Sequence, residues 1–179
     1  MKRAERIRDL IDGCISEMAD DEKELYGEIA AYTVELGYTP KPVKTAHGAS
    51  DALTFTKSRI GRTLLKIRPN HKDGKTQLVL SFFATPEYSD VFQDGIRRVI
   101  EEFDGKYTGC YGCGRCEGDE GYTYVYPDGR AVCRCGLELI ELPPVGAEHA
   151  DADEIRALMR AQDQYWTEKR KRNEGKTSI

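Results

Sequence analysis

Five of the six cysteines in this 179-residue chain fall within 26 residues. Three follow the spacing Cys-x2-Cys-x2-Cys and a Cys-x-Cys pair comes sixteen residues later: Cys110, Cys113, Cys116, Cys133 and Cys135. Glycines at positions 109, 112, 114 and 118 let the backbone curl tightly around the first three. Residues 107–121 contain almost no aliphatic side chains, so apolar burial cannot order this segment. Metal ligation is the substitute that these residue types offer.

The spacing predicts a zinc knuckle, in which four thiolates form a closed tetrahedral shell. The turn Pro-Asp-Gly-Arg at 127–130 returns the chain, so that a second strand can supply the remaining ligand. Cys133 and Cys135 share one face of that strand because they are two residues apart. We favour Cys135 as the fourth ligand because Gly136 gives the backbone room. Cys133 is then an extra thiol, or the ligand in a shifted register.

Two other chemistries remain open for the cluster. The same three cysteines with one remote cysteine resemble the ligands of a cubane iron–sulfur cluster. The position at which a bacterial ferredoxin run places its fourth cysteine is Glu120 here, so that run is broken. Free or redox-paired thiols are the second alternative. Cys14 differs from all five, because it lies on an apolar stripe and is predicted to be an inert buried residue.

Charge and hydropathy argue against a secreted protein, a membrane-spanning protein and a protein coated by nucleic acid. The first residues, MKRAERIRDL, lack the apolar stretch of a secretory signal, and no run approaches the roughly 18 apolar residues that span a bilayer. We therefore expect a cytoplasmic protein with no membrane contact, whose thiols stay reduced. The formal net charge of −4 argues against wholesale coating by nucleic acid.

Hydrophobic periodicity predicts helices over residues 3–19, 20–36, 89–103 and from about 151 onward. Gly37 is expected in a left-handed conformation at the end of the second helix, and Pro40 and Pro42 forbid its continuation. Alternating residues predict strands at 52–57, 122–126 and 131–142, and a hairpin over 62–84. In that hairpin we expect the pair Leu65 and Ile67 to be buried and the pair Lys66 and Arg68 to be exposed.

This order of elements predicts an α+β fold: an antiparallel sheet with helices packed on one face, plus a Cys-rich metal-knuckle hairpin near the C-terminus. Residues 1–106 are expected to form the α+β core, with two N-terminal helices, a β-hairpin and a helix. Residues 107–168 are expected to add the Cys-rich hairpin and a C-terminal helix packed on the same domain. Residues 169–179 are expected to be a flexible basic tail.

Two groups outside the cysteines are candidate contacts to a ligand or nucleic acid. The basic stretch 57–75 includes Arg62, Lys66 and Arg68, which suit phosphate contacts but equally suit the solvated face of a hairpin. Tyr122 and Tyr124 lie on one face of a short strand. They suit a stacking platform for a planar ligand or base, or simple cross-strand packing.

The string CYGCGRCEGDEGYTYVYPDGRAVCRCGLELIEL, followed by an acidic turn and a helix with Gln162, resembles uncharacterised bacterial proteins. Those proteins pair a Cys-x2-Cys-Gly-x-Cys turn with a Gly-Tyr-x-Tyr hairpin. The resemblance covers the last third of the chain and implies that Cys135 is the returning ligand, with Cys133 extra. It implies no activity. The hairpin GRTLLKIR…QLVLSFFAT is similar to small effector-binding α+β domains.

These observations favour a binding or regulatory module over an enzyme. No P-loop, serine-hydrolase elbow or zinc-protease motif occurs, and the three histidines fall in expected loops without a neighbouring nucleophile: His47, His71 and His149. We assign no catalytic residue. The expected protein binds zinc and recognises a small molecule or a macromolecular partner. An iron–sulfur or thiol-based redox protein and a nucleic-acid-binding protein are the alternatives.

Overall fold

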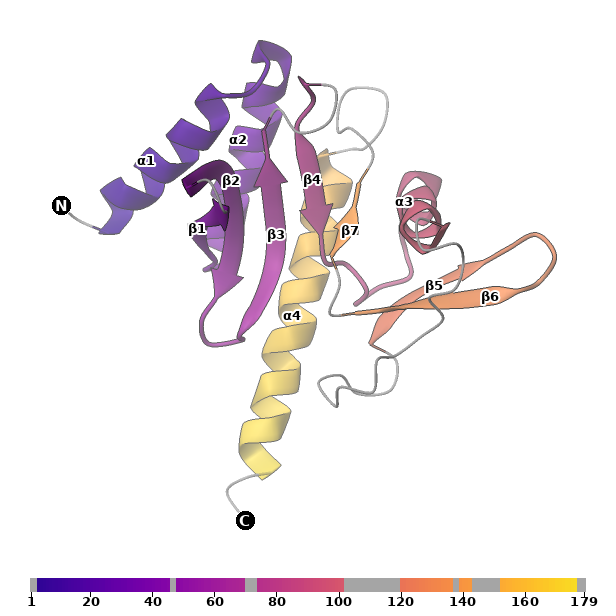
Figure 1. Ribbon diagram of the computed structural model, residues 1–179. Coiled ribbons are helices and arrows are strands. Elements are labelled where there is room, and N and C mark those ends of the chain that lie inside the picture. The colour runs from indigo at the N-terminus through magenta and orange to yellow at the C-terminus, as the bar shows by residue number, and fades with distance from the viewer. Residues whose placement is uncertain are drawn as a thin grey trace.

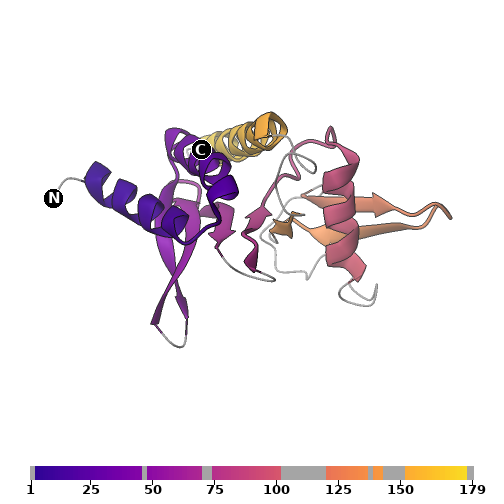
Figure 2. The ribbon, with the colours of Figure 1, turned by 90° about the horizontal axis from the view of Figure 1, so that it is seen from above.

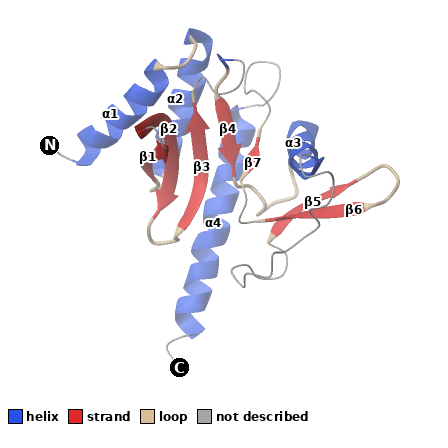
Figure 3. Cartoon of the chain, viewed as in Figure 1, coloured by secondary structure: helices blue, strands red, loops and turns tan. Residues whose placement is uncertain are grey.

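The computed structural model describes residues 3–45, 48–69, 74–101, 120–136, 139–142 and 152–176 (Figure 1). Figure 3 distinguishes the helices and strands of these residues. In chain order they are α1 (Arg3–Ser16), α2 (Asp20–Glu35), β1 (Thr39–Thr45), β2 (Gly48–Lys57), β3 (Arg62–Arg68), β4 (Gln77–Leu80), α3 (Asp90–Glu101), β5 (Gly121–Val125), β6 (Ala131–Cys135), β7 (Ile140–Glu141) and α4 (Ala152–Lys176). The fold is α+β with an antiparallel sheet, as the sequence predicts.

Two sheets organise the described chain. Five strands pair antiparallel in the order β1-β2-β3-β4-β7, and β5 and β6 form a separate antiparallel hairpin. The helices α2 and α4 contact each other and lie on one face of the five-stranded sheet (Figures 1 and 2). α3 instead packs against β7 and the β5–β6 hairpin.

The end of α2 follows from one glycine. Gly37 has a φ of 89°, a left-handed conformation that costs glycine little. Its N–H donates to the Val34 carbonyl at 2.8 Å, and the Tyr38 N–H donates to the Thr33 carbonyl at 3.2 Å. This pair of bonds is the Schellman arrangement, which satisfies the last carbonyls of a helix. The predicted end of the second helix is confirmed.

The strand β1 was not expected from the sequence, because Pro40 and Pro42 were assigned only the role of helix breakers. Both prolines lie in β1, opposite Phe55 and Leu53 of β2. β1 is an edge strand, so one of its sides has no partner strand. The backbone nitrogens of residues two apart along a strand point to the same side. An edge strand tolerates prolines whose nitrogens face its unpaired side, because no hydrogen bond of the ladder is lost.

The predicted hairpin over 62–84 is present as β3 and β4. Leu65 and Ile67 are buried, as expected, but Lys66 and Arg68 are only half-buried, so the expectation that they are exposed is wrong. Arg68 donates from Nη1 to Oε1 of its cross-strand partner Gln77 at 2.8 Å, which holds its side chain along the sheet.

The expected single return strand over 131–142 is two strands in two different sheets. β6 ends at Cys135, and β7 pairs with β4 through Ile140 and Glu141. Leu142 extends this pairing, because its N–H donates to the Leu78 carbonyl at 2.9 Å. Period-two alternation cannot reveal this change, because it stays the same when a strand changes its partner.

The C-terminal helix is longer than expected. α4 continues to Lys176, so the expectation of a flexible tail from residue 169 is wrong over residues 169–176. The basic and acidic side chains of this stretch are good helix formers, and Arg170 pairs with Glu174 one turn later at 2.6 Å. Upstream, Asp163 anchors the helix to the sheet by accepting from the Tyr38 hydroxyl at 2.9 Å and from Lys57 Nζ at 2.7 Å.

An aromatic cluster joins the two sheets. The Phe82 ring is fully buried and meets three rings edge-on at centroid distances of 5.1–5.3 Å: Tyr88, Phe92 and Tyr122. The Phe82 N–H donates to the Tyr122 hydroxyl at 3.0 Å, and that hydroxyl lies 3.5 Å from Ser81 Oγ. Burial raises the pKa of Tyr122 well above its usual value, so the hydroxyl stays protonated.

We predict that Tyr122→Phe lowers the free energy of unfolding by about 1–3 kcal/mol, because the buried Phe82 N–H loses its acceptor. Urea unfolding followed by circular dichroism measures this change. Tyr126→Phe is the matched control, since its hydroxyl makes an exposed bond of 3.3 Å to Glu101. Equal stability of the two variants would contradict the role assigned to the Tyr122 hydroxyl.

Candidate functional site

The β5–β6 hairpin holds the two predicted ligands that the structure describes, with Cys135 at its base and Cys133 at mid-strand. Cys135 pairs with Gly121, the first residue of β5, and Cys133 pairs with Thr123. Cys135 is buried, whereas Cys133 is exposed, with its sulfur 3.4 Å from Thr123 Oγ1. Both are free thiols. The spacing of two places them on the same side of β6.

At this base the two strands lie so close together that neither Gly121 nor Gly136 has room for a side chain. A Cβ at Gly121 would lie 2.6 Å from the Arg134 carbonyl oxygen, and one at Gly136 would lie 2.9 Å from the Glu120 carbonyl group. The Gly136 N–H donates to that Glu120 carbonyl at 3.2 Å. The chain therefore enters β5 directly beside the point at which it leaves β6, next to Cys135.

A buried ion pair attaches this base to α4. Lys169 Nζ lies 2.8 Å from Glu120 Oε1, and their side chains are 13% and 2% exposed. The pair links the residue before β5 to the helix that crosses the main sheet. The hairpin base is consequently held from two directions, by Lys169 and by the Tyr122 contacts with Phe82.

The environment of Cys14 differs from that of the other two described thiols. It is 3% exposed and belongs to the hydrophobic core, as the apolar stripe predicts. Burial, reinforced by the Asp51 carboxylate, raises the pKa of the Cys14 thiol to about 12. The thiol therefore stays protonated at neutral pH and is a poor nucleophile.

The other predicted contacts do not form one site. Tyr122 is buried in the aromatic cluster, so its ring is not available for stacking on a ligand. Tyr124 is half-buried and meets Tyr126 edge-on at a centroid distance of 4.8 Å. Tyr126 directly follows β5, so this contact runs along one strand and not across the hairpin. Arg62 lies at the start of β3 beside a cavity, whereas Lys66 and Arg68 are not among the residues that line it.

That cavity has a volume of about 460 Å³ and lies between the turn after β2 and the C-terminal half of α4. Four of its lining residues are basic: Arg59, Arg62, Lys169 and Arg170. The sequence shows two basic runs, one in 57–75 and one from 169 onward, but it does not show that they meet. Arg170 Nη1 donates to the Arg59 carbonyl, a contact between residues 111 positions apart.

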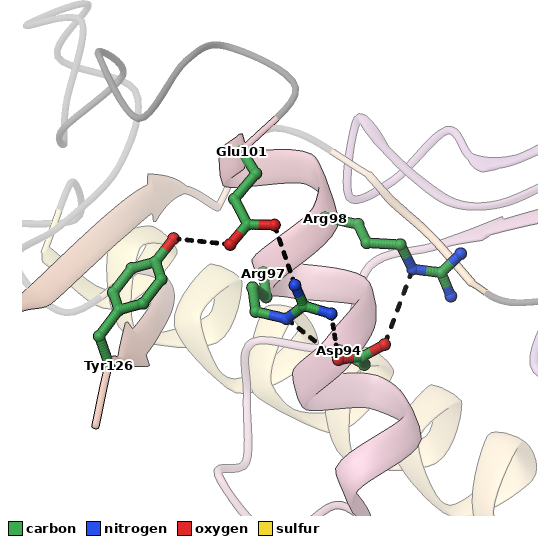
Figure 4. Close-up of polar contacts among 5 residues, drawn as sticks. All are labelled: Asp94, Arg97, Arg98, Glu101 and Tyr126. Carbon is green, nitrogen blue, oxygen red and sulfur yellow. Dashed lines mark hydrogen bonds and ion pairs between the residues drawn. The ribbon is translucent and has the colours of Figure 1, made fainter.

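The exposed face of α3 carries a network of charged side chains (Figure 4). Arg97 lies 2.7 Å from Asp94 and 2.9 Å from Glu101, and the Tyr126 hydroxyl donates to Glu101 at 3.3 Å. Arg98 reaches Asp94 at 4.0 Å. These contacts follow the helical spacing of three and four residues, so they stabilise α3 and attach the tip of the hairpin to it.

Three of the five predicted metal ligands lie outside the described residues: Cys110, Cys113 and Cys116. The three histidines lie outside them as well. Within the part of the chain that the structure describes, no group of three or more His, Cys, Asp or Glu side chains is arranged to hold a metal ion. In the same part, no helix combines the length and apolar character needed to cross a bilayer.

Comparison of the chain with protein-family models, curated proteins and solved structures finds no match.

We predict that Gly121→Ala destabilises the protein by about 1–3 kcal/mol, because the added Cβ overlaps the Arg134 carbonyl oxygen. Gly13→Ala is the control, since nothing lies within 4 Å of its Cβ position in α1. A helical glycine costs about 0.5–1 kcal/mol relative to alanine, so this control should be more stable than the natural chain. Thermal unfolding of both variants tests the close approach at the hairpin base.

Proposed function

We propose that the chain is a zinc-binding module in which Cys110, Cys113, Cys116 and Cys135 hold one ion. The metal staples the Cys-rich segment to the β5–β6 hairpin, and the resulting module recognises a small molecule or a macromolecular partner. Four thiolates form a closed shell that contributes folding free energy and leaves no open position for catalysis. The protein is therefore a binding module and not a metalloenzyme.

The observation that carries this proposal is the geometry of the hairpin base. Cys135 lies where β6 ends, and Glu120 lies beside the following Gly136, with the backbone bond of 3.2 Å between them. Cys116 is four residues before Glu120, so covalent geometry keeps their Cα atoms within about 15 Å. The chain length therefore permits Cys116 and Cys135 to share an ion without opening the hairpin.

The donor chemistry also fits. Soft thiolates select zinc or iron–sulfur clusters over magnesium and calcium. The burial of Cys135 keeps water away from a bound ion, whereas Cys133 is exposed and has a hydroxyl neighbour in Thr123. This difference supports Cys135 as the fourth ligand and Cys133 as an extra thiol.

The metal content of the purified protein tests the proposal. We expect colourless protein with about one zinc per chain, because a closed tetrahedral shell uses four thiolates. Cys113→Ser and Cys135→Ser should lose most of the zinc, and Cys133→Ser should retain it. Cys14→Ala is the matched control, since that thiol lies in the core.

Three outcomes contradict the assignment. Brown protein containing iron and acid-labile sulfide would support the iron–sulfur alternative instead. Protein without metal, whose Cys135→Ser variant is indistinguishable from Cys14→Ala, would exclude a metal centre. Loss of zinc from Cys133→Ser, but not from Cys135→Ser, would exchange the roles of the two strand cysteines.

Alkylation supplies a further prediction. With zinc bound, iodoacetamide should modify Cys133 first, because it is exposed and is not one of the four proposed ligands. A strong chelator should then make the four proposed ligands reactive. Cys14 should react only in denaturant, because burial keeps its thiol protonated. Peptide mass spectrometry reads each site, and rapid labelling of Cys14 in the folded protein would show that the core is open there.

A further inference from the structure

The cavity between the turn after β2 and the end of α4, hereafter the cationic cavity, concentrates charge in a chain whose net charge is −4. Four basic residues and one acidic residue, Glu174, line it, which leaves +3 from four minus one. Glu120 neutralises part of this charge through its pair with Lys169. The local balance remains positive, opposite in sign to the whole chain.

Two of these basic side chains are held in place by contacts that the structure defines. Lys169 is fixed by Glu120 at 2.8 Å, and Arg170 is fixed by Glu174 at 2.6 Å and by the Arg59 carbonyl. A binding site gains affinity when its groups are ordered before the ligand arrives, because less conformational entropy is lost on binding.

Stabilisation of the helix does not account for the whole group. Arg170 stabilises α4 through its pair with Glu174 one turn later, and Lys169 attaches α4 to the hairpin through its pair with Glu120. Arg59 and Arg62 come from the turn after β2 and the start of β3, so they reach the same cavity from a different part of the chain. Basic side chains from two distant parts of the chain therefore line one cavity.

We propose that the cationic cavity binds a small phosphorylated molecule. Guanidinium groups bind phosphate through paired hydrogen bonds, and an ammonium adds a point charge. Ile60 and Trp166 supply apolar lining for the uncharged part of the ligand. The volume of about 460 Å³ falls within the range of roughly 300–1,000 Å³ that is usual for small-molecule sites.

The small extent of this basic group favours a small ligand over nucleic acid. Single-stranded nucleic acid is bound along a basic track with exposed aromatic rings. Here Lys66 and Arg68 do not line the cavity, and Tyr122 is buried. The predicted nucleic-acid contacts therefore do not extend the cavity into such a track.

The chain carries its own reporter, because Trp166 is its single tryptophan and lines the cavity. Titration of the full-length protein with fructose 1,6-bisphosphate and with inorganic phosphate should change tryptophan fluorescence saturably. Fructose, which lacks phosphate, should not. Isothermal titration calorimetry of the same ligands detects binding that leaves the fluorescence unchanged.

Arg59→Ala and Arg62→Ala should each weaken binding of the bisphosphate about tenfold, the loss expected for one charge-assisted contact. Arg59→Ala retains the backbone carbonyl that accepts from Arg170, so the cavity keeps its shape. Arg160→Ala is the matched control. It removes the same charge from α4, but the Arg160 side chain bonds to Tyr32 of α2 and does not line the cavity. Thermal unfolding verifies that each variant is folded. If Arg62→Ala does not fold, the result for Arg59→Ala decides the test.

Several results would overturn the proposal. One is the absence of saturable binding by both methods. Another is equal weakening in Arg160→Ala and Arg59→Ala, which would indicate a general charge effect. The third is tight binding of a single-stranded oligonucleotide, with steep salt dependence and no binding of the bisphosphate, which would assign the surface to nucleic acid.

Discussion

The hydrogen bond from the Phe82 amide to the Tyr122 hydroxyl connects the five-stranded sheet to the β5–β6 hairpin. Both groups are buried, so each must find a partner inside the protein or lose the hydrogen bonds that water would give it. Tyr122 belongs to the β5–β6 hairpin, and Phe82 follows β4 of the main sheet. An isolated two-stranded hairpin is marginally stable in water, so β5 and β6 depend on this attachment and on α3.

The positions of both candidate sites follow from that attachment. With Tyr122 fixed, Gly121 and Gly136 bring the two ends of the hairpin together, and Cys135 lies at their junction. Glu120 then lies within reach of Lys169 on α4, and Lys169 also lines the cationic cavity. One lysine thus links the proposed metal knuckle to the proposed anion site, which gives the two a structural connection.

Sequence reasoning succeeded where local chemistry decides the conformation. Gly37 ends α2 because glycine adopts a positive φ cheaply, and the residue pattern gave both strands of the 62–84 hairpin. It failed where partners distant in sequence decide. Pro40 and Pro42 lie in an edge strand whose tolerance of proline depends on its place in the sheet. The half-burial of Lys66 and Arg68 depends on the residues that pack around them in the folded protein, which the alternation of residue types along the strand does not describe.

By itself, the sequence determined the helices, the turn chemistry and the grouping of five cysteines, because these are properties of residues near one another along the chain. The tertiary structure alone decided that Tyr122 is buried, that β6 and β7 belong to different sheets, and that two basic runs meet at one cavity. The contact from Arg170 to Arg59 joins residues 111 positions apart. No local periodicity encodes such a meeting, since it results from packing α4 across the sheet.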